Sequence, residues 1–422
     1  IPGFRTPDWA KGAVMYQIFV DRFRDGNSAN DVDTDEYLYI GLPVQHIENW
    51  DEKPSAFDVG YFYGGDLSGV REKFAYLKDL GVEVIYFNPL FVSPSNHKYD
   101  TQDYEHIDPH LTVIAEDGGE LLPAEAGDNL NATRYQKRSA DPKNLEASDR
   151  FFAAFTEEAH RFGFRILLDG VFNHCGSFHK WLDREKIYAR EGGYAPGAYL
   201  TPDSPYRKYF VFADKRPEAW PDNKSYDGWW DNDTLPKLNY EASPELAEQI
   251  LEVGEKWLKP PYQVDGWRLD VAADLGHSPD YNHSFWQRFR SRVKAVREDA
   301  LILAEHYGSP ASWLNGREWD SVMNYDGFME PVSWFLTGME KHSDSRDTGL
   351  RGNGAHFWDK MSLAMAKLPE PSLHTAMNQL SNHDHSRFLT RTNGRVGRLA
   401  ELGSAAAEEG VQLSVMRQAA LM

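Results

Sequence analysis

The segment Ile166-Leu-Leu-Asp-Gly-Val-Phe-Asn-His174 combines an apolar run with an acid, an amide and an imidazole near its end. A short apolar run of this length is typical of a buried strand in a parallel sheet. Polar residues at the carboxyl ends of such strands are where α/β proteins place their functional groups. We therefore predict a parallel β-strand over residues 166–172, with Asp169 and His174 at its functional end.

Three later segments show the same pattern, in which an acidic residue ends or follows a strand-like run. Gly266-Trp-Arg-Leu-Asp270 ends in an acid, Glu305 follows an aliphatic run, and Asn382-His-Asp384 follows a further strand-like run. Such runs alternate with helix-period segments, which is the pattern of a parallel α/β fold. We expect strands at residues 13–20, 82–88, 166–172, 264–269, 301–304, 321–324 and 374–380. We expect helices at residues 67–80, 148–162, 244–258, 281–297 and 334–341.

The expected fold class is α/β, a (β/α)8 TIM barrel in preference to an open doubly wound sheet. The acidic residues follow strand candidates, as in barrels whose active sites lie at the carboxyl ends of the strands. No GxGxxG motif follows the first strand, where a dinucleotide-binding sheet would carry one. We predict that residues 111–145 form a long loop and that residues 175–240 form a subdomain inserted after the third strand. The barrel is then assigned to residues 1–174 and 241–422, and its eighth strand and a C-terminal β-domain are expected to be missing.

The composition argues against several classes of partner and site. A formal charge of −20 over 422 residues disfavours nucleic acid and anionic membranes as partners, because a phosphate backbone requires a basic patch. The single cysteine, Cys175, rules out an intrachain disulfide and a zinc ribbon, and leaves the compartment open. No apolar run approaches the roughly 18 residues that suggest a transmembrane helix. The 13 tryptophans indicate flat apolar surfaces for a ligand in addition to core packing.

The acidic residues have chemically distinct surroundings in the sequence. Arg268 and Asp270 lie two positions apart on one strand, so their side chains project from the same face. An arginine favours the ionised form of a carboxylate, which suits a nucleophile, although a structural ion pair would have the same sequence. Glu305 emerges from an apolar run, and burial raises the pKa of a carboxylic acid, as a general acid requires. Asp169 with His174 could by itself be a loop-capping pair. Together, carboxylates at successive strand ends are what retaining glycoside hydrolysis requires.

In order and content, the four segments resemble the conserved regions of the α-amylase family of glycoside hydrolases. The resemblance implies that Asp270 is the nucleophile, Glu305 the general acid/base and Asp384 the stabiliser of the transition state. It also implies roles in binding the sugar or organising the site for His97, Tyr99, Asp169, His174, Arg268, His306 and His383.

A finer resemblance points to one branch of that family. Leu235-Pro-Lys-Leu-Asn239 is similar to an extra conserved region of the neopullulanase, cyclomaltodextrinase and maltogenic amylase group, and other motifs are also similar to amylopullulanases. Two positions depart from the group. Ala273-Asp274 stands where Asn-Glu is usual, and His306 stands where a larger apolar residue is common. Both positions are thought to line the acceptor side, so they leave the linkage preference open.

A loop rich in Asp and Asn precedes the first predicted helix. Its oxygen atoms suit a hard cation, although a polar surface loop would have the same composition. The loop resembles a calcium loop of cyclodextrin glucanotransferases. That resemblance assigns a structural Ca²⁺ ion to Asp25, Asn27, Asn30, Asp31, Gly64 and Asp66. Catalysis itself is expected to need no metal.

We therefore predict a retaining, endo-acting glycoside hydrolase for α-1,4 glucosidic bonds, with α-1,6 bonds as a second candidate. The expected partner is an α-glucan such as starch, pullulan, a cyclodextrin or a maltooligosaccharide. A homodimer is a further expectation from the family group. Double displacement requires the Asp270 and Glu305 carboxyl groups to lie roughly 5–5.5 Å apart. Two alternatives stay open: an α-glucan transglycosylase of the same fold, and a carbohydrate-binding protein on an inactive barrel.

Overall fold

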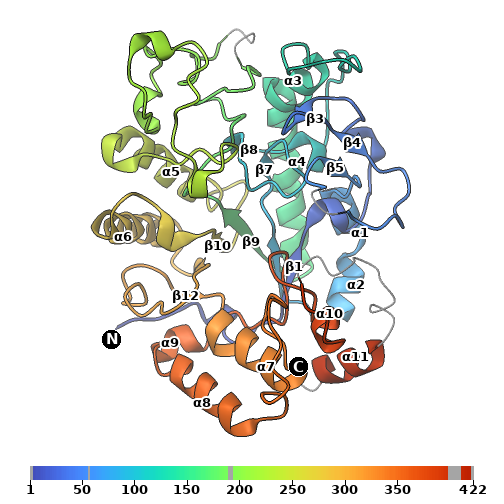
Figure 1. Ribbon diagram of the computed structural model, residues 1–422, viewed down its shortest axis with the longest axis vertical. Coiled ribbons are helices and arrows are strands. Elements are labelled where there is room, and N and C mark those ends of the chain that lie inside the picture. The colour runs from blue at the N-terminus through green and yellow to red at the C-terminus, as the bar shows by residue number, and fades with distance from the viewer. Residues whose placement is uncertain (1–2, 56–57, 189–192, 398–409, 420–422) are drawn as a thin grey trace. The chain divides into compact units, whose positions relative to one another are not determined.

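The computed structural model describes residues 3–55, 58–188, 193–397 and 410–419 (Figure 1). The chain divides into two compact units. The larger unit comprises residues 13–50 and 59–302, and the smaller unit comprises residues 1–12, 51–58 and 303–422. Within the described ranges, no helix is both long enough and apolar enough to cross a membrane.

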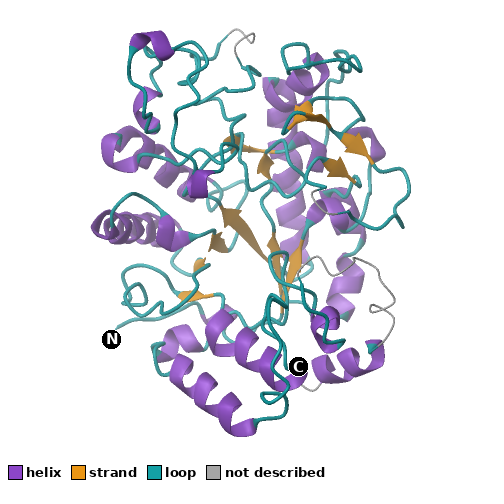
Figure 2. Cartoon of the chain, viewed as in Figure 1, coloured by secondary structure: helices purple, strands orange, loops and turns teal. Residues whose placement is uncertain are grey.

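Parallel strands form the core of the larger unit (Figure 2). They are hydrogen-bonded in the order β1 (Met15–Ile18), β6 (Val84–Phe87), β9 (Arg165–Gly170) and β10 (Gly266–Leu269). The next strand is β11 (Leu301–Ala304), of which the first two residues belong to the larger unit. Every residue of β6 and β10 is buried, which is typical of parallel strands that are covered on both faces.

The helices of the larger unit are α1 (Leu67–Glu72), α2 (Phe74–Asp79), α3 (Thr133–Ala140), α4 (Pro142–Arg161), α5 (Pro244–Lys256) and α6 (Pro279–Val296). The last three begin with one signal, an Asp or Ser whose side chain accepts a backbone N–H, followed by proline. Proline suits this position because the first N–H groups of a helix have no intrahelical partner. Short strands pair outside the main sheet: β2 (Leu38–Tyr39) with β3 (Leu42–Pro43), β4 (Gln45–His46) with β5 (Tyr61–Phe62), and β7 (Phe91–Val92) with β8 (Asp103–Ile107).

The smaller unit is mainly helical. The end of β11 pairs in parallel with β12 (Ser321–Val322), through Leu303 with Ser321 and Ala304 with Val322. A π-helical turn at Tyr325–Met329 then leads directly into a helix. The helices are α7 (Glu330–Thr337), α8 (Gly354–Met365), α9 (Glu370–Leu373), α10 (Phe388–Thr392) and α11 (Val411–Ala419).

The strand predicted at residues 374–380 is wrong as a strand. Only Met377 pairs, in an isolated parallel bridge with Met323. The Met377 N–H donates to the carbonyl of Val322 (3.0 Å), and its carbonyl accepts from the N–H of Asn324 (2.9 Å). The preceding Glu370–Leu373 forms α9, whose first turn contains a proline that favours helix. This segment therefore contributes one paired residue and no ladder of backbone hydrogen bonds.

The loop predicted at residues 111–145 is also wrong in part. Its polar and glycine-rich composition ends near Asn131, and α3 and the first turn of α4 occupy the remainder. Tyr135 and Ala140 of α3 are buried, so packing stabilises this helix within a polar stretch. Other differences are smaller: the helix predicted at residues 67–80 breaks at Lys73, and the one at 334–341 lies at Glu330–Thr337. Gly338, with φ of 71°, ends that helix in the left-handed conformation that glycine adopts readily.

The α/β class is confirmed, and the parallel order β1-β6-β9-β10-β11-β12 is that of a partial (β/α) barrel. Over the described ranges the sheet has six strands where seven were predicted. Residues 175–240 belong to the larger unit and contain isolated bridges such as Phe212 with Tyr226 and Gly228 with Pro236. Their assignment as a separate inserted subdomain stays a prediction.

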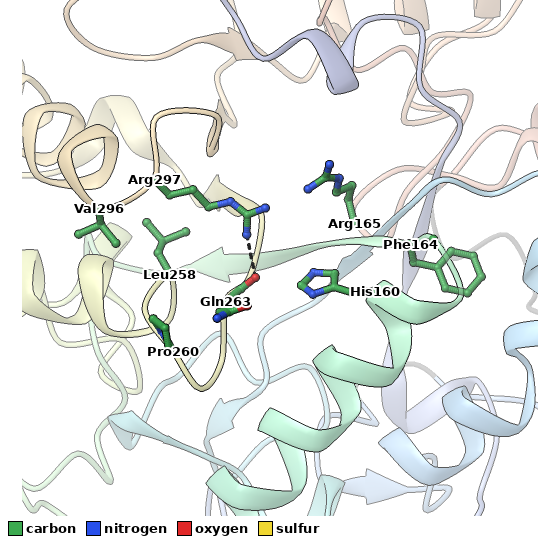
Figure 3. A pocket seen from close by; sticks show the side chains of 9 residues that line it. His160, Phe164, Arg165, Leu258, Pro260, Gln263, Val296 and Arg297 are labelled. Atoms are coloured by element: carbon green, nitrogen blue, oxygen red, sulfur yellow. Dashed lines mark hydrogen bonds between the residues drawn. The ribbon is translucent and has the colours of Figure 1, made fainter.

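A pocket of about 520 Å³ opens at the amino ends of β9 and β10 (Figure 3). It is lined by His160, Gly163, Phe164, Arg165, Leu258, Pro260, Gln263, Val296 and Arg297, and none of these is a predicted site residue. Figure 3 shows His160 and Arg165 on one wall and Arg297 on the other. Asp265 is fully buried and accepts from Nε2 of His160 (2.7 Å), Nη1 of Arg165 (2.8 Å) and Nη2 of Arg297 (2.6 Å). Three residues that line the pocket therefore belong to an ion-pair network around Asp265.

Asp265→Asn should lower the free energy of unfolding by about 3–5 kcal/mol, because it leaves two arginines around an uncharged, buried amide. Burial alone would raise the pKa of Asp265, but His160, Arg297 and Arg165 outweigh it and hold the pKa below its usual value. The matched control is Asp299→Asn, which removes an exposed partner of Arg297 (3.0 Å) and should cost less than about 1 kcal/mol. Urea denaturation of both variants measures the difference. Equal losses in free energy would show that Asp265 contributes no more to stability than an exposed ion-pair partner.

Candidate active site

Arg268 is the centre of a buried polar cluster in the larger unit. It lies on β10 beside Asp169 of β9, because the parallel register pairs these two residues. Its Nη1 donates to both carboxylate oxygens of Asp169 (2.9 and 3.0 Å) and to Oδ1 of Asp270 (2.8 Å). The side chain of Arg268 is fully buried. The prediction that Arg268 and Asp270 project from the same face is confirmed.

Asp169 accepts hydrogen bonds from two tyrosines as well. The hydroxyls of Tyr86 and Tyr99 donate to its Oδ2 over 2.6 and 3.0 Å. Burial raises the pKa of Asp169, while Arg268 and the two hydroxyls oppose that shift by favouring the carboxylate. With both oxygens occupied by donors, Asp169 orients Arg268 and Tyr99 and is poorly placed to react itself.

Asp270 follows the last residue of β10 and retains 8% of its surface. The next residue, Val271, has φ of 36°, in the left-handed region that β-branched residues rarely adopt. Strained backbone of this kind persists where the surrounding structure overdetermines it, and it is frequent at functional sites. Arg268 thus holds the carboxylate of Asp270, and the left-handed turn at Val271 follows directly in the chain.

His174 forms the base of an aromatic stack. Its Nε2 lies 3.2 Å from the carbonyl oxygen of Tyr99, and burial lowers its pKa to about 3, so the ring is neutral. The imidazole stacks on Trp229 with 5.2 Å between ring centroids, and Trp229 stacks on the exposed Trp230 at 4.7 Å. His97 lies beside Tyr99 with 6.0 Å between their rings. Five rings therefore lie on or beside the Arg268 cluster, and the outermost of them, Trp230, is exposed.

The segment at residues 235–239 has a structural role beside this stack. Lys237 bridges in antiparallel fashion to His174, and its Nζ donates to Oδ1 of Asn173 and to the carbonyl of Asp274. Oδ2 of Asp274 accepts from the indole N–H of Trp229 (2.9 Å). Asp274, at a position that departs from the family group, therefore orients the stacked tryptophan.

The predicted set of site residues lacked Tyr86, Trp229, Lys237 and Asp274 as polar partners. Tyr86 lies inside an apolar strand, where an aromatic side chain is expected to be core. Lys237 and Asp274 belong to motifs identified in the sequence, but their hydrogen-bond partners could be identified only in the structure.

In the smaller unit, Glu305 follows β11 and retains 4% of its surface. The hydroxyl of Tyr325 donates to its Oε1 (3.2 Å), and Nδ2 of Asn382 donates to that hydroxyl oxygen (3.0 Å). Glu305 is thus a buried carboxyl group held by a neutral donor.

Asp384 has a more open position, with 44% of its side chain exposed. Its Oδ2 lies 3.3 Å from Nε2 of His383, and its backbone N–H donates to Oδ1 of Asn382 (2.9 Å). His306 packs against Trp313, with 4.9 Å between the rings. The smaller unit therefore connects Glu305 to the Asp384 segment, and the larger unit gathers His97, Tyr99, Asp169, His174, Arg268 and Asp270. The joint catalytic role of these residues stays a prediction.

The residues predicted to hold calcium lie in one part of the larger unit. Asp66 caps α1, where its Oδ1 accepts from the N–H groups of Gly69 (2.6 Å) and Gly26 (3.1 Å). Nδ2 of Asn30 donates to Oδ2 of Asp66 (3.2 Å). Among the described residues, Oδ1 of Asn30 and Oδ1 of Asp31 are buried and have no hydrogen-bond partner. Two such oxygens in one place suit a cation, since buried acceptors without partners are costly.

Charge accumulates around Asp31. Burial, followed by the charges of Asp25, Asp66 and Asp21, raises the pKa of Asp31 to about 7. Gly64 has φ of 78°, and a Cβ there would lie 2.6 Å from Oδ1 of Asp31, so the loop needs glycine. In the described part of the chain, no three His, Cys, Asp or Glu side chains form a metal-binding group by themselves. A cation here would need amide and carbonyl oxygens beside the carboxylates, a mixed ligand set that Ca²⁺ accepts.

Comparison with known proteins gives one coherent result. The model of the α-amylase catalytic domain matches residues 17–117 and 148–411. Neopullulanase 2 of Thermoactinomyces vulgaris is 34% identical over 396 residues, which cover 93% of this chain and 53% of that protein. An amylopullulanase of Thermoanaerobacter thermohydrosulfuricus is 34% identical over 418 residues, which cover 91% of this chain and 25% of that protein. The chain thus spans about half, or less, of the length of these relatives.

A solved structure gives the same result. The cyclic α-maltosyl-(1→6)-maltose hydrolase of Arthrobacter globiformis, in complex with maltose, is 28% identical and superposes with a TM-score of 0.66. That match covers 92% of this chain and 70% of the hydrolase. The resemblance inferred from the four segments is confirmed: the chain belongs to the α-amylase family and carries the catalytic domain of that family.

Proposed function

We propose that this protein is a retaining, endo-acting glycoside hydrolase that cleaves α-1,4 glucosidic bonds, and also α-1,6 bonds where its site admits them. The observation that carries the proposal is the Arg268 cluster, which binds Asp270 at 2.8 Å and holds it with Asp169. A guanidinium bonded to a carboxylate favours the ionised form, and a nucleophile must be ionised before it attacks. Membership of the α-amylase family supports the same assignment.

In the proposed mechanism, Asp270 attacks the anomeric carbon while Glu305 gives its proton to the leaving glycosidic oxygen. Glu305 then removes a proton from water, which hydrolyses the covalent glycosyl-enzyme, so the α configuration is retained. Asp384, with His383 beside it, is the proposed stabiliser of the positive charge that develops on the sugar. The neutral His174, Tyr99 and His97 would contact the sugar that reacts.

The proposed substrate class is the α-glucans, including starch, pullulan, cyclodextrins and maltooligosaccharides. It is supported by relatives named neopullulanase and amylopullulanase and by a related structure that holds maltose. Hydrolysis and transfer to a second sugar share the glycosyl-enzyme, so product analysis at high maltose concentration measures their ratio. Self-association into a homodimer stays a prediction from the family group.

We also propose that Asp25, Asn27, Asn30, Asp31, Gly64 and Asp66 bind one structural Ca²⁺ ion. Support comes from the two buried acceptors without partners and from the repulsion among the carboxylates. A divalent ion there would neutralise that repulsion and stabilise the loop that leads into α1, and the chemistry of hydrolysis would not pass through it.

The catalytic assignment is tested by Asp270→Ala and Glu305→Ala, each of which should lower kcat/KM on maltooligosaccharides by about 10³-fold or more. Azide distinguishes the two roles. With α-maltosyl fluoride, whose leaving group needs little protonation, azide should attack the donor directly in Asp270→Ala and give the β-glycosyl azide, whereas in Glu305→Ala it should attack the glycosyl-enzyme and give the α-glycosyl azide. NMR of the products reads the anomer. The matched control is Asp299→Asn, a surface carboxylate, which should retain activity. Exchanged anomers would reverse the roles, and full activity in either variant would refute them.

The calcium proposal predicts a thermal stabilisation that depends on pH. Because the folded pKa of Asp31 is raised to about 7, above its unfolded value near 3.8, the folded state holds a proton that the unfolded state lacks between these values. Without metal, this group therefore destabilises the fold as pH rises from 4 to above 7. Protons compete with Ca²⁺, so the apparent affinity should be roughly a hundredfold lower at pH 5 than at pH 8.

Differential scanning calorimetry with chelator and with added CaCl₂ checks this. Asp31→Asn should raise the melting temperature of the calcium-free protein at pH 8 and abolish the gain from calcium. Asp128→Asn is the control, because Asp128 is another loop carboxylate outside the proposed site, and its Oδ1 accepts the backbone N–H of Leu130 (2.9 Å). A calcium gain that survives in Asp31→Asn would place the ion elsewhere.

A further inference from the structure

A short chain of hydrogen bonds in the smaller unit ends on Glu305. Asn382 Nδ2 donates to the hydroxyl oxygen of Tyr325 (3.0 Å), and that hydroxyl donates to Oε1 of Glu305 (3.2 Å). Oδ1 of Asn382 points the other way and accepts the backbone N–H of Asp384 (2.9 Å). One amide side chain therefore connects the two acidic segments of this unit.

Chemistry fixes the direction of every donor in this chain. A backbone N–H only donates, so the Asn382 atom that faces Asp384 is its oxygen and the atom that faces Tyr325 is its nitrogen. The hydroxyl of Tyr325 has two acceptors in reach, Oε1 of Glu305 (3.2 Å) and Sδ of Met323 (3.4 Å), and its single proton goes to the carboxyl oxygen because a thioether sulfur is a weak acceptor. Nδ1 of His385 also lies 2.6 Å from Oδ1 of Asn382. Burial lowers the pKa of His385 to about 2, so this ring is neutral and donates through Nδ1.

We propose that Tyr325 and Asn382 are positioning residues for Glu305, which hold its carboxyl group by Oε1 for proton exchange with the substrate. This inference rests on the proposed function, in which Glu305 is the general acid/base. In the first step the O–H bond of Glu305 breaks and its proton goes to the glycosidic oxygen, which leaves with the C–O electron pair while Asp270 bonds to the anomeric carbon. In the second step the water oxygen bonds to that carbon, the bond to Asp270 breaks, and the proton from water returns to Glu305. Tyr325 keeps its own proton throughout.

A neutral donor suits a group that must change its charge. The Tyr325 hydroxyl can donate to Oε1 whether Glu305 is a carboxylate or a carboxylic acid, whereas a cationic partner would oppose protonation. Donation from Asn382 polarises the hydroxyl and strengthens its bond to Glu305. The charged and titratable groups around the Asn382 end are Asp384 and those that act on His385, namely His342, Arg391, Lys341 and His383. Tyr307 stacks on Tyr325 with 4.6 Å between the rings.

The test compares the pH dependence of kcat/KM for the wild-type protein and Tyr325→Phe on maltotriose. Loss of a hydrogen-bond donor to the carboxylate form should favour the protonated acid, so the alkaline limb of the pH profile should move up by about one pH unit. Activity at the optimum should fall about tenfold on maltotriose, but much less on α-maltosyl fluoride, whose leaving group needs little protonation. Asn382→Ser removes the amide donor and should move the same limb in the same direction by a smaller amount.

Two controls separate the possible causes. Tyr135→Phe removes another buried hydroxyl, which donates to Oε1 of Gln102 (2.6 Å), and it should leave the pH limb unchanged even if the melting temperature falls. Glu305→Gln tests the proposed function itself. If Glu305→Gln is inactive but folded Tyr325→Phe and Asn382→Ser keep the wild-type limb, the positioning role is overturned and the proposed function stands. If the wild-type protein does not hydrolyse α-glucans, or Glu305→Gln hydrolyses them as fast, both inferences fail together.

Discussion

The buried guanidinium of Arg268 constrains how the central strands of the larger unit pair. A guanidinium without solvent is tolerated only when carboxylates surround it, and Arg268 is bonded to Asp169 and Asp270 at 2.8–3.0 Å. These bonds exist only in the register that sets Arg268 opposite Asp169. A slip of one residue would bring the side chain of Trp267 to that place and turn the charge toward the opposite face. The register between β9 and β10 therefore also determines the position of the proposed nucleophile, Asp270.

That constraint reaches the surrounding loops through Tyr99. Its hydroxyl donates to Asp169, and its carbonyl lies 3.2 Å from His174. His174 carries the stacked Trp229, and Asp274 accepts from the indole of that tryptophan. The loops that would meet a sugar are thus built outward from the strand ends, contact by contact. The polar residues near these strands therefore contact one another, and these contacts position them for a ligand.

The sequence was informative wherever local pattern and chemistry agree. Buried parallel strands give unbroken apolar runs, so the strands that carry Asp169, Arg268 and Glu305 could be predicted together with the acids at their ends. The starts of helices with an Asp or Ser cap and a proline were predicted to within a few residues, except for α4. Its cap, Asp141, lies inside residues 111–145, a stretch whose overall polar composition predicted a loop. Local pattern failed at residues 374–380, because a strand exists only where a neighbour offers backbone groups, and there only Met377 pairs.

Within the site, the sequence predicted Arg268 and the acids around it but missed Lys237, Asp274 and the neutral donors. Tyr86 and Tyr325 are aromatic residues in apolar surroundings, so their pattern is that of core, and their hydroxyls become informative only when Asp169 and Glu305 are seen to accept from them. Retaining hydrolysis needs one carboxylate that stays ionised and one that gains and loses a proton. A fixed cation supplies the first condition, because it opposes protonation at every stage. A hydroxyl supplies the second, because it can donate to either form. Asp270 accepts from Arg268, and Glu305 accepts from Tyr325. These two contacts match the two proposed roles, which the residue types alone would not distinguish, since an isolated Asp and an isolated Glu have nearly the same pKa.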